Sequence, residues 1–231
     1  MTPASQIDFS YKIERTRRRT VAIYIDPARG VLVRAPKRVR DSEIEEFILK
    51  KSRWITGKLA EVQKRAADIP CHTYSDGDVF HYLGDGYVLR ICEGKRGASI
   101  VGREIMLCLK PGDPPESLRQ TLKKWYSDMA REKFSERVTY YSNAIGVQPN
   151  RIAVRNQARR WGSCSGKGNV NLNLKLIMAP PGILDYVVAH ELCHLRHPNH
   201  SPEFWNLLAK TVPDFAERRR WLKENGHKFV L

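Results

Sequence analysis

Four histidines fall within residues 186–205, YVVAHELCHLRHPNHSPEFW, and the first two bracket a glutamate in the order His-Glu-x-x-His. Side chains four residues apart lie on one face of an α-helix, about 6 Å apart along its axis. His190 and His194 can therefore bind one metal ion together, and zinc is the ion that this motif typically holds. Glu191 is turned about 100° from His190. It therefore borders the ion and is predicted to act as a general base.

The residues around this motif are apolar on nearly every side of the expected helix, which predicts that the helix is buried. Buried imidazoles beside a buried carboxylate need a partner that compensates for their lost hydration, and a metal ion is such a partner. The apolar set is Ile183, Leu184, Tyr186, Val187, Val188, Ala189, Leu192, Cys193 and Leu195.

The third ligand is predicted to be His200 and not His197. Seven residues of unbroken helix would put His197 about 10.5 Å from His190 along the axis, too far for one tetrahedral ion. Pro198 also disfavours helical geometry at residue 197, so the helix should end there and let His200 approach from another direction. Glu203 is a weaker alternative ligand, and His197 is interpreted as an outer or surface group.

Three protein ligands leave the fourth zinc position open for water, as in catalytic sites. We expect zinc-bound water to attack a peptide carbonyl while Glu191 accepts its proton. Arg160 and Tyr186 are the candidates for stabilising the oxyanion, although packing or surface charge also explains them. One Zn²⁺ per chain is the expected cofactor.

Residues 169–176, NVNLNLKL, alternate polar and apolar residues, which predicts a half-buried strand just before the motif helix. Such a strand can bind a peptide substrate by β-augmentation. Arg160, Asn171 and Asn173 are therefore predicted substrate contacts. The alternative is that the two asparagines are hydrated or satisfy nearby loops.

The remaining elements alternate between strand and helix patterns. In the N-terminal part we expect a hairpin at 20–36 around a turn at 26–30, a helix at 42–66 that starts at the Ser42–Glu45 capping box, and short strands over 71–110. A long helix over 118–145 should end at Gly146.

Residues 151–176 should then form a second hairpin around a turn at 165–168. Helices are expected to start at Pro180–Pro181, at Ser201–Pro202 and near Pro213–Asp214, the last one ending at Gly226. These elements predict an α+β fold. The proline-rich connector at 111–115 is the predicted boundary between a β-rich part, 1–112, and a catalytic part, 113–231.

Composition restricts the setting and the partners of the chain. Forty lysines and arginines against 25 acidic residues give a net charge of +15, which favours nucleic acid, nucleotides or other anionic partners. The five cysteines are scattered without a C-x-x-C pair, which argues against a disulfide framework and for a reducing cytoplasm. No secretory signal or membrane span is indicated. The oligomeric state is not indicated.

The stretch from Arg155 to Trp205 closely resembles the YgjP-like metallopeptidase family, which is related to the SprT-like and WLM zinc proteases. The N-terminal hairpin, Trp54-Ile55 and the Tyr-Leu-Gly of 82–84 fit the upstream part of the same family, so the resemblance spans nearly the whole chain. The resemblance rests on the segment RWGSCS at 160–165, the Asn-x-Asn pair, the His-Glu-Leu-x-His helix and NHS at 199–201 followed by Phe204-Trp205. It implies a zincin-like domain with the motif helix under a small β-sheet, preceded by a β-rich part. It also implies His200 as the third zinc ligand. SprT-like and WLM relatives act on DNA-attached proteins, which suits the basic charge by analogy only.

Two other functions remain open from the sequence. A metal-activated water can also attack phosphorus, so a nucleotide phosphohydrolase or pyrophosphatase is one alternative. A non-catalytic nucleic-acid-binding module with structural zinc is the other. Structural zinc sites normally have four protein ligands, and the intact Glu191 with no obvious fourth ligand argues against that reading.

Overall fold

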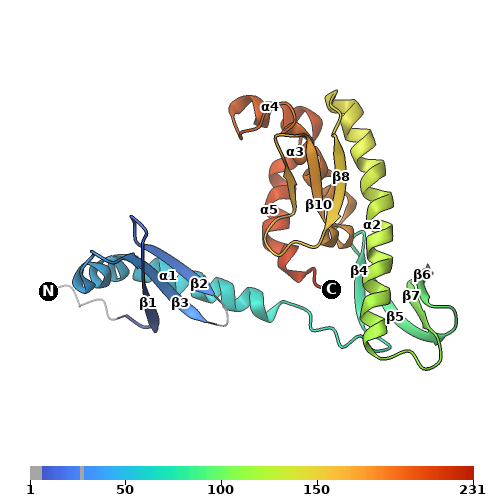
Figure 1. The fold of residues 1–231 in the computed structure, drawn as a ribbon, viewed down its shortest axis with the longest axis horizontal. Coiled ribbons are helices and arrows are strands. Elements are labelled where there is room, and N and C mark those ends of the chain that lie inside the picture. Colours follow the sequence, from blue (N-terminus) through green and yellow to red (C-terminus); the bar gives the residue numbers. More distant parts are fainter. Residues whose placement is uncertain (1–6, 27–28) are drawn as a thin grey trace. The chain divides into compact units, whose positions relative to one another are not determined.

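The computed structural model describes residues 7–26 and 29–231, and the chain forms two compact units, Met1–Ile69 and Pro70–Leu231 (Figure 1). The boundary between the units falls between residues 69 and 70 of the sequence. The connector at 111–115, predicted to be the boundary, lies inside the second unit. The first unit is therefore smaller than the β-rich part that the sequence predicted.

The first unit is a three-stranded sheet packed on one long helix. Strands β1 (Tyr11–Thr16), β2 (Ala22–Asp26) and β3 (Gly30–Pro36) have the order β1-β3-β2, and helix α1 spans Asp41–Ala67. Strands β2 and β3 pair antiparallel, which confirms the predicted hairpin, although turn residues 27 and 28 lie outside the described residues. Alternate residues of β3 and one face of α1 form the core: Val31, Val33, Ala35, Ile44, Ile48 and Ile55.

Helix α1 begins slightly earlier than the predicted capping box. Its first residue is Asp41, and Arg40 is at the N-cap. The Glu43 carboxylate accepts a hydrogen bond from the Arg40 backbone N–H at 3.3 Å. Glu43 therefore has the role that the sequence assigned to Glu45.

The second unit starts with a four-stranded sheet, as the short-strand pattern over 71–110 predicted. Its strands are β4 (Val79–Tyr82), β5 (Asp85–Glu93), β6 (Gly97–Val101) and β7 (Glu104–Leu109), in the order β4-β5-β7-β6. Strands β6 and β7 pack against helix α2 (Glu116–Ile145). Because this sheet shares its core with α2, the connector between them is an internal turn and not a linker.

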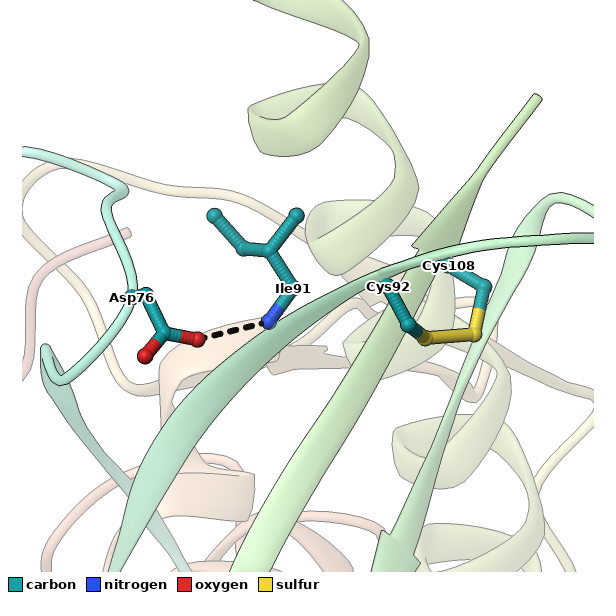
Figure 2. The surroundings of a disulfide bond; sticks show 4 residues. All are labelled: Asp76, Ile91, Cys92 and Cys108. Atoms are coloured by element: carbon teal, nitrogen blue, oxygen red, sulfur yellow. Dashed lines mark hydrogen bonds between the residues drawn. A yellow bond between two sulfur atoms is a disulfide. The ribbon is translucent and has the colours of Figure 1, made fainter. Parts of the chain in front are cut away.

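A disulfide joins Cys92 to Cys108, and the cysteine-spacing argument against disulfides was wrong for this pair. The two cysteines are opposite each other in the register of the parallel strands β5 and β7. Figure 2 shows the bond and, on Ile91 next to Cys92 in β5, the backbone N–H that donates a hydrogen bond to the Asp76 carboxylate at 2.9 Å. The other three cysteines, Cys71, Cys164 and Cys193, are free.

The rest of the second unit is a three-stranded sheet against helices. Strands β8 (Arg151–Arg155), β9 (Gly162–Cys164) and β10 (Asn169–Asn173) have the order β8-β10-β9. They are followed by the 3₁₀ helix η1 (Leu174–Met178), helices α3 (Pro181–Cys193), α4 (Pro202–Thr211) and α5 (Phe215–Asn225), and the 3₁₀ helix η2 (Gly226–Lys228). Helix α2 packs on both α3 and β8 and runs along this sheet in Figure 1.

The predicted helix ends in this unit are largely confirmed. Gly146 caps α2 with a left-handed φ of 71°, and Pro181 is the first residue of α3. Helix α3 is tied to α2 by the Arg137 guanidinium, which donates to both carboxylate oxygens of Asp185 at 2.6 and 3.0 Å. Across the described part of the chain, no helix has the length and apolar content needed to cross a membrane.

The predicted strand at 169–176 ends at Asn173 and continues as η1. The Asn173 side chain causes this change, because its Oδ1 accepts a hydrogen bond from the Lys175 backbone N–H at 3.1 Å. The turn buries Leu174 and Leu176 together. A strand would have placed both on the same face as Val170 and Leu172, so the apolar pattern alone did not reveal the turn.

Candidate metal centre

Three histidines converge at the end of α3. His190 lies in its last turn, His194 is its C-cap residue, and His200 is in the loop before α4; one ligand atom from each lies within 4.8 Å of the other two. Nε2 of His190 and Nε2 of His200 are 3.1 Å apart. Two nitrogens bound to one tetrahedral zinc lie about 3.3 Å apart. The three imidazoles therefore fit a zinc-sized ion.

The chain reverses between the second and third histidines by ending α3 at Cys193. The backbone N–H groups of Leu195 and Arg196 bond three residues back, to the carbonyls of Leu192 and Cys193, which tightens the last turn. Nδ1 of His194 lies 3.2 Å from the backbone carbonyl of His197. Metal-binding histidines usually donate their other N–H in this way, and the bond leaves Nε2 of His194 for the ion.

His197 therefore contributes its backbone to the site, in agreement with the outer position that the sequence indicated for it. Glu203, the weaker alternative ligand, is not part of the cluster; its carboxylate accepts a hydrogen bond from the Ser201 hydroxyl at 2.6 Å. Ser201 occupies the N-cap of α4 and Pro202 its first position, as predicted.

Metal binding requires neutral imidazoles. Burial, together with the nearby His194, His200 and Arg219, lowers the pKa of His190 to about 3. Burial also lowers the pKa of His194. Nδ1 of His190 is buried, and no partner for it exists among the residues that the structure describes.

An aromatic wall supports the three rings. Phe204 on α4 is fully buried, and its ring centroid lies 5.0, 4.6 and 4.8 Å from those of His190, His194 and His200. Trp205 stacks on His200 at 5.2 Å, and the Arg219 guanidinium from α5 lies 5.3 Å above the Trp205 ring. The aromatic rings pack against the imidazoles and hold them in place. Arg219 adds one cation beside the site. No role was predicted for these residues from the sequence, although the Phe204-Trp205 pair was part of the family resemblance.

Glu191 borders the cluster from the interior. Glu191 is only 7% exposed, and burial raises the pKa of its carboxyl to about 7. Strand β9 lies against it: a Cβ added at Gly162 would be 2.6 Å from both Cγ and Oε1 of Glu191. Only a residue without a side chain allows β9 to approach the carboxyl this closely. Gly162 belongs to the RWGSCS segment of the family resemblance, but no role was predicted for it from the sequence.

Register explains why β9 and not β10 lines the site. Gly162 is opposite Leu172, which is buried in the core. Directly opposed residues share a face of the sheet, so Gly162 faces α3. Strand β10 lies between β8 and β9 and pairs with both, so neither of its edges is available for a substrate strand. The prediction of β-augmentation along 169–176 was therefore wrong.

The three predicted substrate contacts do not gather around the histidines. Asn173 is 3% exposed, and its Nδ2 donates to the carbonyls of Gln157 and Arg160 at 2.8 and 2.7 Å. The Asn171 amide donates to Ser163 Oγ at 3.2 Å, on the sheet face opposite Leu172. The Arg160 side chain is exposed. Both asparagines hold the β9–β10 hairpin and the loop before it, as the alternative interpretation of these residues proposed.

One known protein family matches most of the chain. The YgjP-like, metallopeptidase domain family matches residues 19–225. The chain belongs to this family of metallopeptidases, as the resemblance implied, and the fold is of mixed α and β structure.

Two solved structures are similar to parts of the chain. One is the crystal structure of the metallopeptidase zymogen of Pyrococcus abyssi abylysin, at 21% identity and a TM-score of 0.37, covering 42% of this chain and 99% of that one. The other is the metallopeptidase zymogen of Methanocaldococcus jannaschii jannalysin, at 22% identity and a TM-score of 0.34, covering 39% of this chain and 95% of that one. Likenesses of this size carry no argument about the present site. Among curated proteins, none matches the sequence.

Proposed function

We propose that the protein is a zinc-dependent metallopeptidase of zincin-like layout, with His190, His194 and His200 as the ligands of one zinc ion. The observation that carries the proposal is the convergence of three imidazoles, with one ligand atom of each within 4.8 Å of the others, beside a buried glutamate. A zinc ion held there would supply Lewis-acid polarisation of the substrate carbonyl and activate a water molecule. The family supports peptides as the substrate class.

Glu191 is the general base of this proposal. Its buried carboxylate accepts a proton from the attacking water and passes that proton to the amine that leaves. Tyr186, one helical turn before His190, has its ring centroid 5.8 Å from the His190 ring. Its hydroxyl is the candidate donor to the substrate oxyanion, whereas the side chain of Arg160, the other candidate, is exposed.

We propose that the substrate lies along the free edge of β9. Within residues 7–26 and 29–231, β9 pairs only with β10, so its other edge has unpaired backbone groups that can bind an extended peptide. Gly162 on this strand already touches Glu191. A peptide added beside β9 would therefore run past both the base and the histidines.

Cytoplasmic location and contact with nucleic acid or nucleotides through the basic surface stay proposals that rest on composition. The net charge of +15 supports an anionic partner. The Cys92–Cys108 disulfide weakens the case for a reducing compartment, because disulfides are rare there.

The test is cleavage of casein and of a fluorogenic peptide library by the zinc-loaded protein, with Glu191→Gln as the test variant. We expect this variant to bind zinc one-to-one and to lose roughly 10²–10⁴-fold in kcat/KM, the contribution typical of a general base. Glu203→Gln is the matched control, because this nearby carboxylate is exposed and outside the cluster. It should retain activity.

Two results would contradict the proposal. Peptide cleavage that persists in Glu191→Gln would remove the assigned base. Release of phosphate from nucleoside triphosphates by the wild type, without cleavage of any peptide, would support the phosphohydrolase instead. A chelator should abolish cleavage and zinc should restore it.

A further inference from the structure

Strand β8 forms the edge of the β8–β10–β9 sheet opposite to β9. All five of its residues, Arg151–Arg155, pair with β10, and no further strand of the described chain pairs with it. A strand in this position has a row of backbone N–H and C=O groups directed away from its neighbour. Among the residues that the structure describes, no hydrogen bond to these backbone groups is present beyond the pairing with β10.

A cavity of about 400 Å³ lies beside this strand. All five residues of β8 line one side of it, and Arg131, Phe134 and Ser135 of α2 line the other. Its volume is within the range of about 300–1,000 Å³ that ligand sites have. We call this cavity the β8 groove. It lies at the edge of the sheet opposite to β9, the strand that touches Glu191, so the proposed peptidase site does not account for it.

The β8 groove has excess positive charge. Arg151 and Arg155 are exposed, and neither forms an ion pair with any described residue. Arg131 pairs with Asp128 at 2.8 Å, but this carboxylate also pairs with Lys124. Each wall of the groove therefore has an arginine, and anionic groups are favoured in it.

Strand geometry adds a pattern to this charge. Residues 151, 153 and 155 lie on one face of β8, and residues 152 and 154 lie on the other. Val154 packs against the core, and Ile152 keeps 37% of its surface exposed. The side chains of an added strand would share these faces, so acidic residues would lie beside Arg151 and Arg155 and apolar residues beside Ile152.

We propose that the β8 groove binds an extended acidic peptide segment as an additional strand beside β8, with acidic and apolar residues in alternation. The segment needs about five residues to match the length of β8. Backbone hydrogen bonds supply the general affinity, and the arginines select the acidic sequence. The partner is an exposed, acidic, extended stretch of another protein.

The test measures binding of a fluorescein-labelled peptide, Glu-Val-Glu-Val-Glu-Val-Glu, to the full-length Glu191→Gln protein by fluorescence anisotropy. This background prevents cleavage of the probe and leaves β8 unchanged. We expect saturable binding to the acidic peptide and none to its Lys-Val counterpart. The double variant Arg151→Glu/Arg155→Glu should weaken binding of the acidic peptide roughly tenfold or more, because like charges then oppose each other.

Arg220→Glu/Lys223→Glu is the matched control. It reverses two exposed charges on α5, outside the β8 groove, and should bind the acidic peptide as the parent does. A peptide N-methylated at alternate residues keeps its charge but loses half of its backbone donors, and it should bind much more weakly. Hydrogen exchange gives a measurement that needs no groove variant: the peptide should protect the amides of 151–155 and leave those of α5 unchanged.

Three results would overturn the proposal. One is the absence of saturation at about 1 mM peptide, a concentration at which even weak binding is detected. Another is that the α5 variant weakens peptide binding as much as the Arg151→Glu/Arg155→Glu variant does. The peptide would then be attracted only by the total charge of the protein. The third is that single-stranded oligothymidylate and the N-methylated peptide bind as tightly as the acidic peptide does, because the β8 groove would then be a general anion site. None of these outcomes depends on peptidase activity.

Discussion

Replacing Gly162 by alanine should disable the proposed base while leaving the histidines in place. The new Cβ would be 2.6 Å from Cγ and Oε1 of Glu191 and 2.8 Å from its Cδ. Carbon contacts are comfortable at about 3.5–4.0 Å, so the carboxylate must move by about 1 Å. A misplacement of that size at a reacting group lowers the rate by about 10²-fold. The backbone itself tolerates alanine, because Gly162 is not among the glycines with positive φ.

The assay compares kcat/KM, zinc affinity and urea unfolding for Gly162→Ala and Gly166→Ala. Gly166 is in the turn of the same hairpin, and a Cβ there meets nothing within 4 Å, so the control should behave as wild type. We expect Gly162→Ala to keep its zinc affinity and to lose about 1 kcal/mol of stability, the low end for overpacking, because the end of a side chain can shift. Full activity in Gly162→Ala would refute the close approach of β9 to the base.

Three further perturbations test the site and its support. His200→Ala should lower zinc affinity by more than the roughly 10–100-fold that outer-sphere changes cause. His197→Ala should retain zinc affinity, because only the backbone carbonyl of His197 contributes to the site. Competition with a chromophoric chelator measures the zinc affinity of both variants. Asn173→Ala should cost about 1–3 kcal/mol in urea unfolding by leaving buried backbone groups unpaired, and an unchanged midpoint would contradict its structural role. The Ile91 N–H and the Arg90 guanidinium hold the pKa of Asp76 below its usual range. The resulting stabilisation is present above about pH 4 and is lost as the pH falls through the folded-state pKa, so Asp76→Asn should destabilise the protein at pH 7 and match wild type in strong acid.

Short-range spacing was sufficient to predict the histidine cluster. The four-residue interval puts His190 and His194 on one helical face, and Pro198 ends the helical geometry before His200. These relations involve neighbours along the chain, so local backbone geometry decides them. The same reason explains why Gly146 and Pro181 were correctly predicted as helix ends.

Only the tertiary structure decided the sheet order, the disulfide and the boundary between the two units. Alternating residues identify a strand and its buried face, but they do not say which strands are its neighbours. The alternation of β10 shows its buried face but not its place in the sheet: β10 lies in the centre, and the short β9 is the edge beside Glu191. Cys92 and Cys108 meet because two parallel strands share a register.

The sequence by itself therefore determined the chemistry of this protein: which imidazoles gather and which carboxyl lies beside them. The fold decided which backbone edges and surfaces remain available to a partner. The physical reason is that helical neighbours follow from a fixed rise per residue, whereas strand pairing joins distant segments through backbone groups that every residue carries.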